Sequence, residues 1–451
     1  MSHGTGTDSE VGSLRTVLVH RPGPELRRVT PRTLSRLQFD AVPWVARAQR
    51  EHDALTDVLR DHGAEVLYLT ELLQDVLEYS VARQRAITSV LDAGDLGEDL
   101  AGRLGQHLDS LPPEDLAATL IAGLTGDELR SGRGLVYELL DPRDFVIEPL
   151  PSLVFSRDSS IWIGDQPVVA GLVGARRRET DLLALVYAHH PRFGGLGQNF
   201  TALNGSLHGG DVLLLGPGVV AVGVGVRTTP AAAEQLARHL LSEGLAHTVL
   251  AVPLSQRGQG SYLDRLCTVV GEGTVIMFPA LAFTLTALSI TVGQGELRVS
   301  RPRPFLEAAA RAIGVDALRV IDTGTEPRAP HPGAPGQWDD GTNALALGPR
   351  LTLCNERNAD TNARLAAAGF EVIEVPGTEL GGLRGGPRCM CAPIDRDPAG
   401  RPDHALEASE SGRPGIPAGP APVLLGGPAA SEPADPESGH ARRAEELAPT
   451  S

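Results

Sequence analysis

Apolar positions along the chain follow one pattern that recurs about five times. A stretch with helical spacing leads to a glycine, and a short β-branched run follows. Four copies are clear, at residues 53–69, 234–252, 307–322 and 362–375, and a more degenerate fifth runs from 168 to 188. In the clear copies leucine and alanine recur at helical spacing, and the glycine ends the helix before a strand begins.

Apolar strands precede some of these helices, so each unit is expected to be strand–helix–strand. Residues 219–230 read VVAVGVGVRTTP, in which Thr228 or Thr229 is the expected cap and Pro230 the first helical residue. Residues 351–362 and 14–22 supply similar first strands. Such units cannot bury their apolar faces alone and must pack around a shared centre. An α/β fold of about five repeated units is expected, and an ordinary doubly wound sheet is the alternative.

Two regions depart from the repeat. Residues 72–130 are rich in Leu, Ala, Asp, Glu and Arg, and Pro112 and Pro113 open a helix there, which predicts a helical insertion. Residues 399–451 are dense in Pro, Gly, Ala, Ser and Glu with almost no aromatic side chains, which predicts a disordered tail. One catalytic domain is therefore expected over residues 10–398.

Charge and cysteine content narrow the partners and the compartment. The net charge of −16 argues against nucleic acid or an anionic membrane as partner. Four cysteines in 451 residues make no disulfide framework, and Cys389 and Cys391 are too close together for a zinc knuckle. No apolar segment has the length of an export signal or a membrane span, so a reducing cytoplasm is expected.

Chemistry is concentrated in five segments beside apolar strands. Residues 384–391 read RGGPRCMC, in which glycines permit close approach of the backbone to a ligand and two arginines favour a carboxylate and a thiolate. Cys389 is therefore a candidate nucleophile. The other segments are PLPSLVFSRDSSIW at 149–162, SLHGGD at 206–211, GVGVR ending at Arg227, and SYLD at 261–264.

The order and spacing of these segments resemble the arginine deiminase family over residues 10–398. Matching segments also include LRTVLVHRPGPELRRVTP at 14–31, FDAVPWVARAQREHDAL at 39–55, RRRET at 176–180 and QWDDGTNALAL at 337–347. The resemblance implies a five-fold pseudosymmetric α/β propeller with a helical insertion. It also implies attack of a thiolate on the guanidinium carbon of arginine, release of ammonia, and hydrolysis of the amidino-thioether to citrulline. No metal or organic cofactor is implied. The expected partner is a small guanidino substrate, and the sequence leaves open whether the chain forms a homo-oligomer.

The resemblance assigns roles position by position. Cys389 falls on the nucleophile, and Asp158 and Asp264 fall on the carboxylates that contact the guanidinium. Arg176, Arg227 and Arg384 fall on the substrate-binding and loop arginines. The alternative for both aspartates is a structural ion pair.

Four positions depart from the family pattern. Tyr262 stands where the general acid/base histidine is expected, and His208 replaces the glutamate before Gly-Gly-Asp. Ser152 replaces an asparagine that helps to bind the substrate carboxylate, and Leu383 replaces a glycine before the last arginine. The segment between residues 193 and 206 is also shortened. Tyrosine titrates near pH 10 and is therefore a poor general base. Replacing the glutamate by His208 beside a cationic substrate weakens the electrostatic attraction by on the order of a few kcal/mol. Ordinary arginine deimination should therefore be impaired, unless the base has moved to His208.

Two rival functions follow from these departures. The altered pocket could act on another guanidino or amidino compound, as hydrolase or amidinotransferase, or the protein could bind arginine without catalysis. Outside the site, Cys267, Cys354, Cys391, Trp162 and Trp338 are expected in the core. Arg177 and Arg178 are expected to be solvated residues at the start of a helix.

Overall fold

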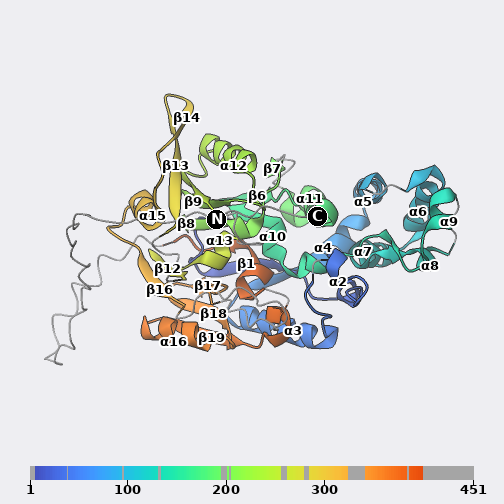
Figure 1. Ribbon diagram of the computed structural model, residues 1–451, viewed down its shortest axis with the longest axis horizontal. Coiled ribbons are helices and arrows are strands. Elements are labelled where there is room, and N and C mark those ends of the chain that lie inside the picture. The colour runs from blue at the N-terminus through green and yellow to red at the C-terminus, as the bar shows by residue number, and fades with distance from the viewer. Residues whose placement is uncertain are drawn as a thin grey trace, which may run out of the picture. The chain divides into compact units, whose positions relative to one another are not determined.

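The computed structural model describes residues 6–37, 39–93, 96–130, 134–194, 201–202, 205–254, 262–278, 284–323, 341–382 and 385–399 (Figure 1). Over these residues the fold is mixed α/β. The described strands form six small sheets rather than one continuous sheet, so the doubly wound alternative is wrong. The proposed tail and Trp338 lie outside the described residues.

Five three-stranded units share one pairing plan. In each, the first two strands are antiparallel and the last two are parallel. The units are β20 (Ala392–Arg396), β1 (Leu14–Val19) and β2 (Glu65–Tyr68); β5 (Ser160–Ile163), β6 (Gln166–Val169) and β7 (Thr201–Ala202); β8 (Val212–Gly216), β9 (Val219–Val224) and β10 (Thr248–Pro253); β11 (Cys267–Gly271), β12 (Thr274–Met277) and β16 (Arg319–Asp322); β17 (Leu345–Gly348), β18 (Leu351–Asn355) and β19 (Glu371–Val375).

A long helix lies between the two parallel strands of every unit, as the repeated pattern predicted. These helices are α3 (Val45–Asp61), α11 (Arg177–His189), α12 (Pro230–Ser242), α15 (Phe305–Ile313) and α16 (Ala359–Ala367). Thr229 caps α12, because its hydroxyl accepts the N–H of Ala232, and Pro230 is the first helical residue. Gly314 ends α15 with a φ of 80°, a left-handed conformation that favours glycine.

Three more strands extend the β8–β9–β10 sheet. β13 (Thr286–Gly293) pairs with β10, and both β14 (Glu296–Val299) and β15 (Arg303–Pro304) pair with β13. Figure 1 shows β13 and β14 as a hairpin.

Helices dominate residues 69–139, where the repeat pattern is interrupted. They are α4 (Leu69–Leu77), α5 (Ser80–Ala93), α6 (Gly97–Ser110), α7 (Pro113–Ala122), α8 (Gly126–Leu129) and α9 (Leu135–Leu139), with the small sheet of β3 (Leu124–Thr125) and β4 (Phe145–Ile147). Pro113 is the first residue of α7, as predicted. The buried leucines of these helices share one apolar cluster with α11 and Trp162.

Arg178 was predicted to be solvated, and this is wrong. It is 6% exposed, and its guanidinium donates to the carbonyls of Leu120 and Glu148. α11 packs against α4 and α5, so its first turn is covered on the side of Arg178, whereas Arg177 is exposed. Two backbone acceptors compensate the buried cation.

Among the described residues, short elements precede the first strand of four of the five units. α10 (Ser156–Ser159) precedes β5, the 3-10 turn η4 (Gly209–Asp211) precedes β8, α13 (Leu263–Leu266) precedes β11, and α18 (Pro387–Met390) precedes β20. α10 contacts α18 and η4, and η4 contacts α13. The repeat therefore gathers four segments that are far apart in the sequence. The remaining short elements are α1 (Pro24–Arg27), α2 (Leu34–Leu37), α17 (Thr378–Gly382), η1 (Pro151–Val154), η2 (Gly174–Arg176) and η3 (Pro191–Phe193).

The core predictions for cysteine and tryptophan are confirmed where they can be seen. Cys267, Cys354, Cys391 and Trp162 are each at most 3% exposed. No helix in the described part of the chain is long and apolar enough to span a membrane.

Candidate active site

A buried ion network joins the starts of three units to the N-terminal segment. Arg157 and Arg388 donate to the Glu10 carboxylate at 2.6 and 3.1 Å, and Arg388 also donates to Asp264 at 3.0 Å. All four side chains are at most 5% exposed. Burial alone would raise the pKa of Glu10, but the charges of Arg157, Arg388 and Arg396 outweigh it and hold that pKa at about 2. Glu10 is therefore a permanent anion at neutral pH.

Cys389 lies on α18, directly after Arg388 of this network. Its Sγ is 2.8 Å from the Asn343 side-chain nitrogen and 3.8 Å from Asp264 Oδ2. Burial and then the charges of Asp264 and Asp158 raise the pKa of the thiol, against smaller opposing effects of Asn343 and Arg388. These effects favour the neutral thiol over the thiolate.

Asp158 lies on α10, and its pKa is shifted downward, whereas that of the Cys389 thiol is shifted upward. Its Oδ2 accepts from Arg176 at 3.1 Å and is 3.3 Å from His208 Nε2. Burial would raise the pKa of Asp158, but His208 and Arg176 lower it to about 2. Arg176 also donates twice to Glu179, at 3.0 and 2.9 Å, so its guanidinium is held between two carboxylates.

His208 has both ring nitrogens engaged. Nδ1 accepts the N–H of Gly210 at 3.2 Å, so the proton of the neutral ring must be on Nε2, which faces Asp158. The neighbouring Gly209 is required by packing, because a Cβ there would lie 1.9 Å from the Arg157 carbonyl oxygen. This close contact brings η4 against α10 and fixes His208 beside Asp158.

Tyr262 stacks on His208, with ring centroids 4.2 Å apart and planes inclined by 29°. The guanidinium groups of Arg227 and Arg265 lie 5.4 and 5.2 Å from the centre of the tyrosine ring. Burial and the charge of Asp158 raise the pKa of Tyr262, although nearby arginines oppose this. The phenol is therefore neutral near pH 7 and is a poor base.

A cavity of about 370 Å³ brings most of the predicted site residues together. It is lined by Asp158, Arg176, His208, Arg227, Tyr262, Asp264 and Cys389, and Ser152 also borders it. Arg227 has no carboxylate partner among the described residues. Arg384 and Leu383, which were predicted for the same site, lie outside the described residues. Within the described part of the chain, no cluster of His, Cys, Asp or Glu could hold a metal ion.

Three residues of the site were missed by the sequence reasoning. Asn343 lies in QWDDGTNALAL, two residues before β17, and its place before the first strand of a unit was the available signal. Asp211 follows the glycine pair and accepts the Thr228 hydroxyl at 2.6 Å and the Leu263 N–H at 2.9 Å. Burial raises the pKa of Asp211 to about 6. Glu10 stands in a segment with no motif, and nothing in the sequence marks it.

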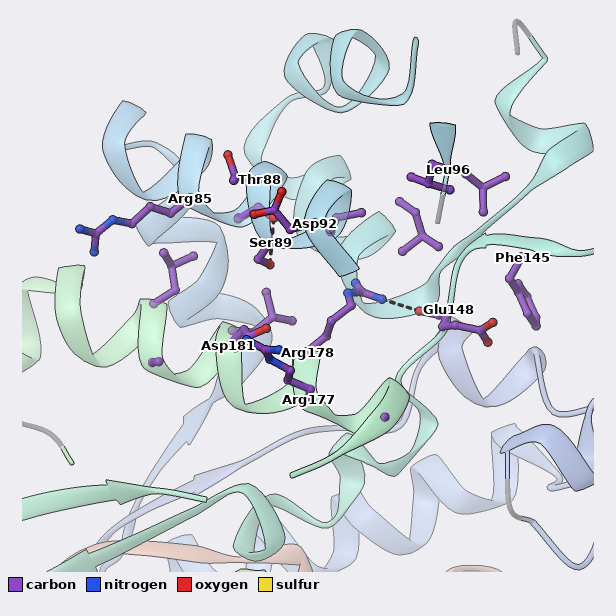
Figure 2. Close-up of a pocket in the computed structure, with 18 of the residues that line it drawn as sticks. Arg85, Thr88, Ser89, Asp92, Leu96, Phe145, Glu148, Arg177, Arg178 and Asp181 are labelled. Atoms are coloured by element: carbon purple, nitrogen blue, oxygen red, sulfur yellow. Dashed lines mark hydrogen bonds between the residues drawn. The ribbon is translucent and has the colours of Figure 1, made fainter. Parts of the chain in front are cut away.

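A second cavity, of about 1190 Å³, lies between α5 and α11 (Figure 2). It shares Arg36 and Gly174 with the first cavity. Arg85, Asp92 and Arg177 line it, but all three are exposed. The dashed bond from Arg178 to the carbonyl of Glu148 in Figure 2 shows that this buried cation is already satisfied. The sequence-predicted site residues that the structure describes line the first cavity and not the second.

Comparisons with known proteins agree on one family. The family model described as arginine deiminase matches residues 35–396. An arginine deiminase of Mycobacterium avium is 51% identical over 399 residues, covering 87% of this chain and 98% of that protein. One from Rhodococcus erythropolis is 49% identical over 398 residues, again covering 87% of this chain and 98% of that protein.

Solved structures give weaker matches. A DDAH mutant from Pseudomonas aeruginosa complexed with citrulline has 14% identity and a TM-score of 0.48, covering 84% of this chain and 99% of that chain. An amidinotransferase from Microseira wollei has 13% identity and a TM-score of 0.48, covering 87% of this chain and 97% of that chain.

Proposed function

The chain belongs to the arginine deiminase family, and we propose that it hydrolyses L-arginine to L-citrulline and ammonia through a thioether on Cys389. The observation that carries the mechanism is the position of the Cys389 thiol, 3.8 Å from Asp264 in one cavity with Asp158. A planar cation placed between two carboxylates presents its central carbon to a sulfur at the same cavity wall.

Binding of the substrate cation activates the Cys389 thiol. The resting thiol is kept neutral by burial and by two nearby negative charges. A bound guanidinium neutralises those charges and brings a positive charge to the sulfur, so the pKa of the thiol falls. Arg227, which lies against the Tyr262 ring and has no carboxylate partner among the described residues, binds the carboxylate of the substrate. Arg176 orients Asp158 toward the substrate cation.

Proton transfer is assigned to Asp264. Burial is the main cause that raises the pKa of Asp264, so this carboxyl group can take the proton of the thiol. Sulfur then forms a bond to the guanidinium carbon, one C–N bond breaks, and ammonia leaves with the proton from Asp264. A water next adds to the same carbon and gives one proton to Asp264, which passes it to solvent. The C–S bond then breaks, and the second proton of the water regenerates the thiol.

The predicted move of the base to His208 has less support. Its Nδ1 lone pair accepts from Gly210 and its Nε2–H faces Asp158, so the ring must turn before it can accept a proton. In the observed position His208 instead orients Asp158. His208 also leaves the site with fewer carboxylates for a cation, which favours a second candidate function on a less basic guanidino or amidino compound.

The wider organisation is part of the same proposal. Five units share one pairing plan, and the starting segments of four of them are joined by contacts of α10 with α18 and η4 and of η4 with α13, which supports closure into a five-fold propeller over residues 10–398. The helices of residues 72–130 form an insertion in this domain. Four free cysteines support a reducing cytoplasm. The proposal includes association of the chain into a homo-oligomer, which analytical ultracentrifugation can test.

The deciding experiment measures citrulline and ammonia from L-arginine. The purified protein is compared with the variants Cys389→Ala, His208→Ala and Tyr262→His. Cys391→Ala is the matched control, because Cys391 lies two residues away in the core. We expect Cys389→Ala to lose activity by more than about 10³-fold while the control keeps it.

Other outcomes separate the candidate functions. A silent wild type that gains citrulline formation with Tyr262→His would show that the scaffold is intact but that arginine hydrolysis is not its native reaction. A panel of guanidino and amidino substrates, assayed for ammonia, urea and amidino transfer, then tests the second candidate. Activity that survives Cys389→Ala refutes the thioether route.

A further inference from the structure

Asn343 makes a two-point contact with the nucleophilic residue. Its side-chain oxygen accepts the backbone N–H of Cys389 at 3.2 Å, and its side-chain nitrogen lies 2.8 Å from Cys389 Sγ. A backbone N–H can only donate, so this contact fixes which end of the amide is oxygen. The N–H donor end must therefore face the sulfur.

The contact is built into the packing of both segments. Asn343 is 4% exposed, and a Cβ on Gly386 would lie 3.0 Å from its Cβ and Cγ. A side chain at 386 would have to displace Asn343, so glycine at this position favours the close approach of the cysteine loop to the segment before β17. The amide therefore has one orientation, and it spans the main chain and the side chain of Cys389.

The repeat of the fold gives this residue a defined place. Asp158, His208, Asp264 and Cys389 each lie within four residues of the first strand of a unit, and Asn343 holds the corresponding place before β17. The other four units each contribute a cavity-lining side chain from this place. The fifth unit contributes its side chain to the sulfur.

We propose that Asn343 is a positioning residue that holds Cys389 Sγ for attack and stabilises its thiolate by N–H donation. The proposal rests on the proposed function, because it concerns the nucleophile of that reaction. A hydrogen bond to a charged acceptor is stronger than one to a neutral acceptor, so the amide favours the thiolate over the thiol. Asp264 on the other side accepts the S–H of the resting thiol at 3.8 Å, so the sulfur lies between one donor and one acceptor.

The test measures alkylation of Cys389 by iodoacetamide from pH 6 to 10, without substrate, with peptide mass spectrometry to locate the adduct. The other three cysteines are at most 2% exposed, and burial raises the pKa of each to about 12. Asn343→Asp keeps the shape but replaces the donor with a carboxylate, whereas Asn343→Ala removes both contacts. Thr342→Val is the matched control, since Thr342 is buried next to Asn343 and, within the described part of the chain, its hydroxyl donates to the Arg265 carbonyl and not to Cys389.

We expect alkylation of Asn343→Ala to be roughly tenfold slower at each pH below the thiol pKa, and that of Asn343→Asp to be slower still. The control should follow the wild-type profile. If Asn343→Asp matches wild type within twofold while remaining folded, the proposal is overturned. Faster alkylation of both variants also overturns it, because it would mean that Asn343 only covers the sulfur. Loss of citrulline formation plays no part in this readout, so a failure of the proposed reaction is detected separately.

Discussion

Asp158 and Asp264 are both buried in one cavity and both bonded to an arginine, yet their surroundings move their pKa values in opposite directions. Burial acts to raise both. For Asp158 it is outweighed by His208 and Arg176, and its pKa is about 2. For Asp264 burial prevails, because Arg388 is shared with Glu10 and the Val212 carbonyl, and the charge of Asp158 adds to the effect. The first is suited to hold a cation, and the second to carry a proton.

The arginines beside the two aspartates differ in burial, so removing a charge beside each should have a different effect. Arg388 is 1% exposed and joins segments that are hundreds of residues apart, whereas Arg176 is 21% exposed and faces the cavity. Loss of an anion beside Arg388 leaves a cation that no water can reach. Loss of an anion beside Arg176 leaves a cation that still bonds to Glu179 and is partly exposed to solvent. Substitutions on the first side should affect folding, and those on the second side should affect substrate binding.

The largest expected effect is that of Glu10→Gln. Removing this charge leaves Arg157 without its carboxylate and Arg388 with Asp264 alone, so the free energy of unfolding should fall by about 3–5 kcal/mol. Urea denaturation measures it. Asp53→Asn is the control, because the Arg21–Asp53 pair is 43% exposed on both sides and should contribute less than about 1 kcal/mol. Equal losses of unfolding free energy in Glu10→Gln and Asp53→Asn would contradict the expectation that the buried ion network stabilises the fold more than an exposed ion pair does.

Asp158→Asn should act on catalysis instead. The substituted amide no longer attracts the guanidinium, so kcat/KM for citrulline formation should fall roughly 100-fold. The thermal unfolding midpoint should fall less than in Glu10→Gln, because Arg176 keeps two bonds to Glu179. Steady-state kinetics and calorimetry on the same preparation give both numbers. A stability loss as large as that of Glu10→Gln would make Asp158 a structural ion-pair partner, which was the alternative for it.

The predictable part of this molecule is the part with local chemistry. Helix spacing, the cap at Thr229 and the glycine at 314 are short-range features, and the sequence shows all of them. The segments around Asp158, His208, Asp264 and Cys389 were found because acids, bases and glycines beside strands are distinctive. Their meeting in one cavity followed from the repeat.

The missed residues depend on distant contacts. Glu10 is defined by Arg157 and Arg388, which lie more than a hundred positions away, and no local pattern marks such a partner. Arg178 looked like part of a solvated basic run, and only the packing of α11 against α4 and α5 buries it. The hydrogen bonds that restrain His208 come from Gly210 geometry, which the sequence SLHGGD does not reveal.

The stability of Asp211→Asn at different pH values tests the raised pKa of this buried carboxyl group. The unperturbed pKa of 3.8 is raised to about 6 in the fold, so the folded protein binds the proton more tightly than the unfolded chain. Stability from this group is therefore lost as pH rises from about 4 to 6, and the cost is complete above that range. We expect Asp211→Asn to be more stable than wild type at pH 7, by about 1–2 kcal/mol, with no difference below about pH 4. Denaturation at both pH values measures this, and a variant that is less stable at pH 7 contradicts the direction of the shift.

Tyr262→Phe should have the smallest effect and bears most directly on the unusual wall of the site. The ring stacks on His208 and lies under Arg227 and Arg265, and phenylalanine can keep these contacts. The hydroxyl makes no hydrogen bond to the described residues, and its raised pKa keeps it neutral at working pH. Removing it should therefore change kcat/KM by less than about threefold, whereas Tyr262→Leu should cost more because the stack and the cation–π contacts are lost. If Tyr262→Phe instead abolishes turnover while Tyr262→His keeps it, the hydroxyl takes part in proton transfer and Asp264 does not act alone.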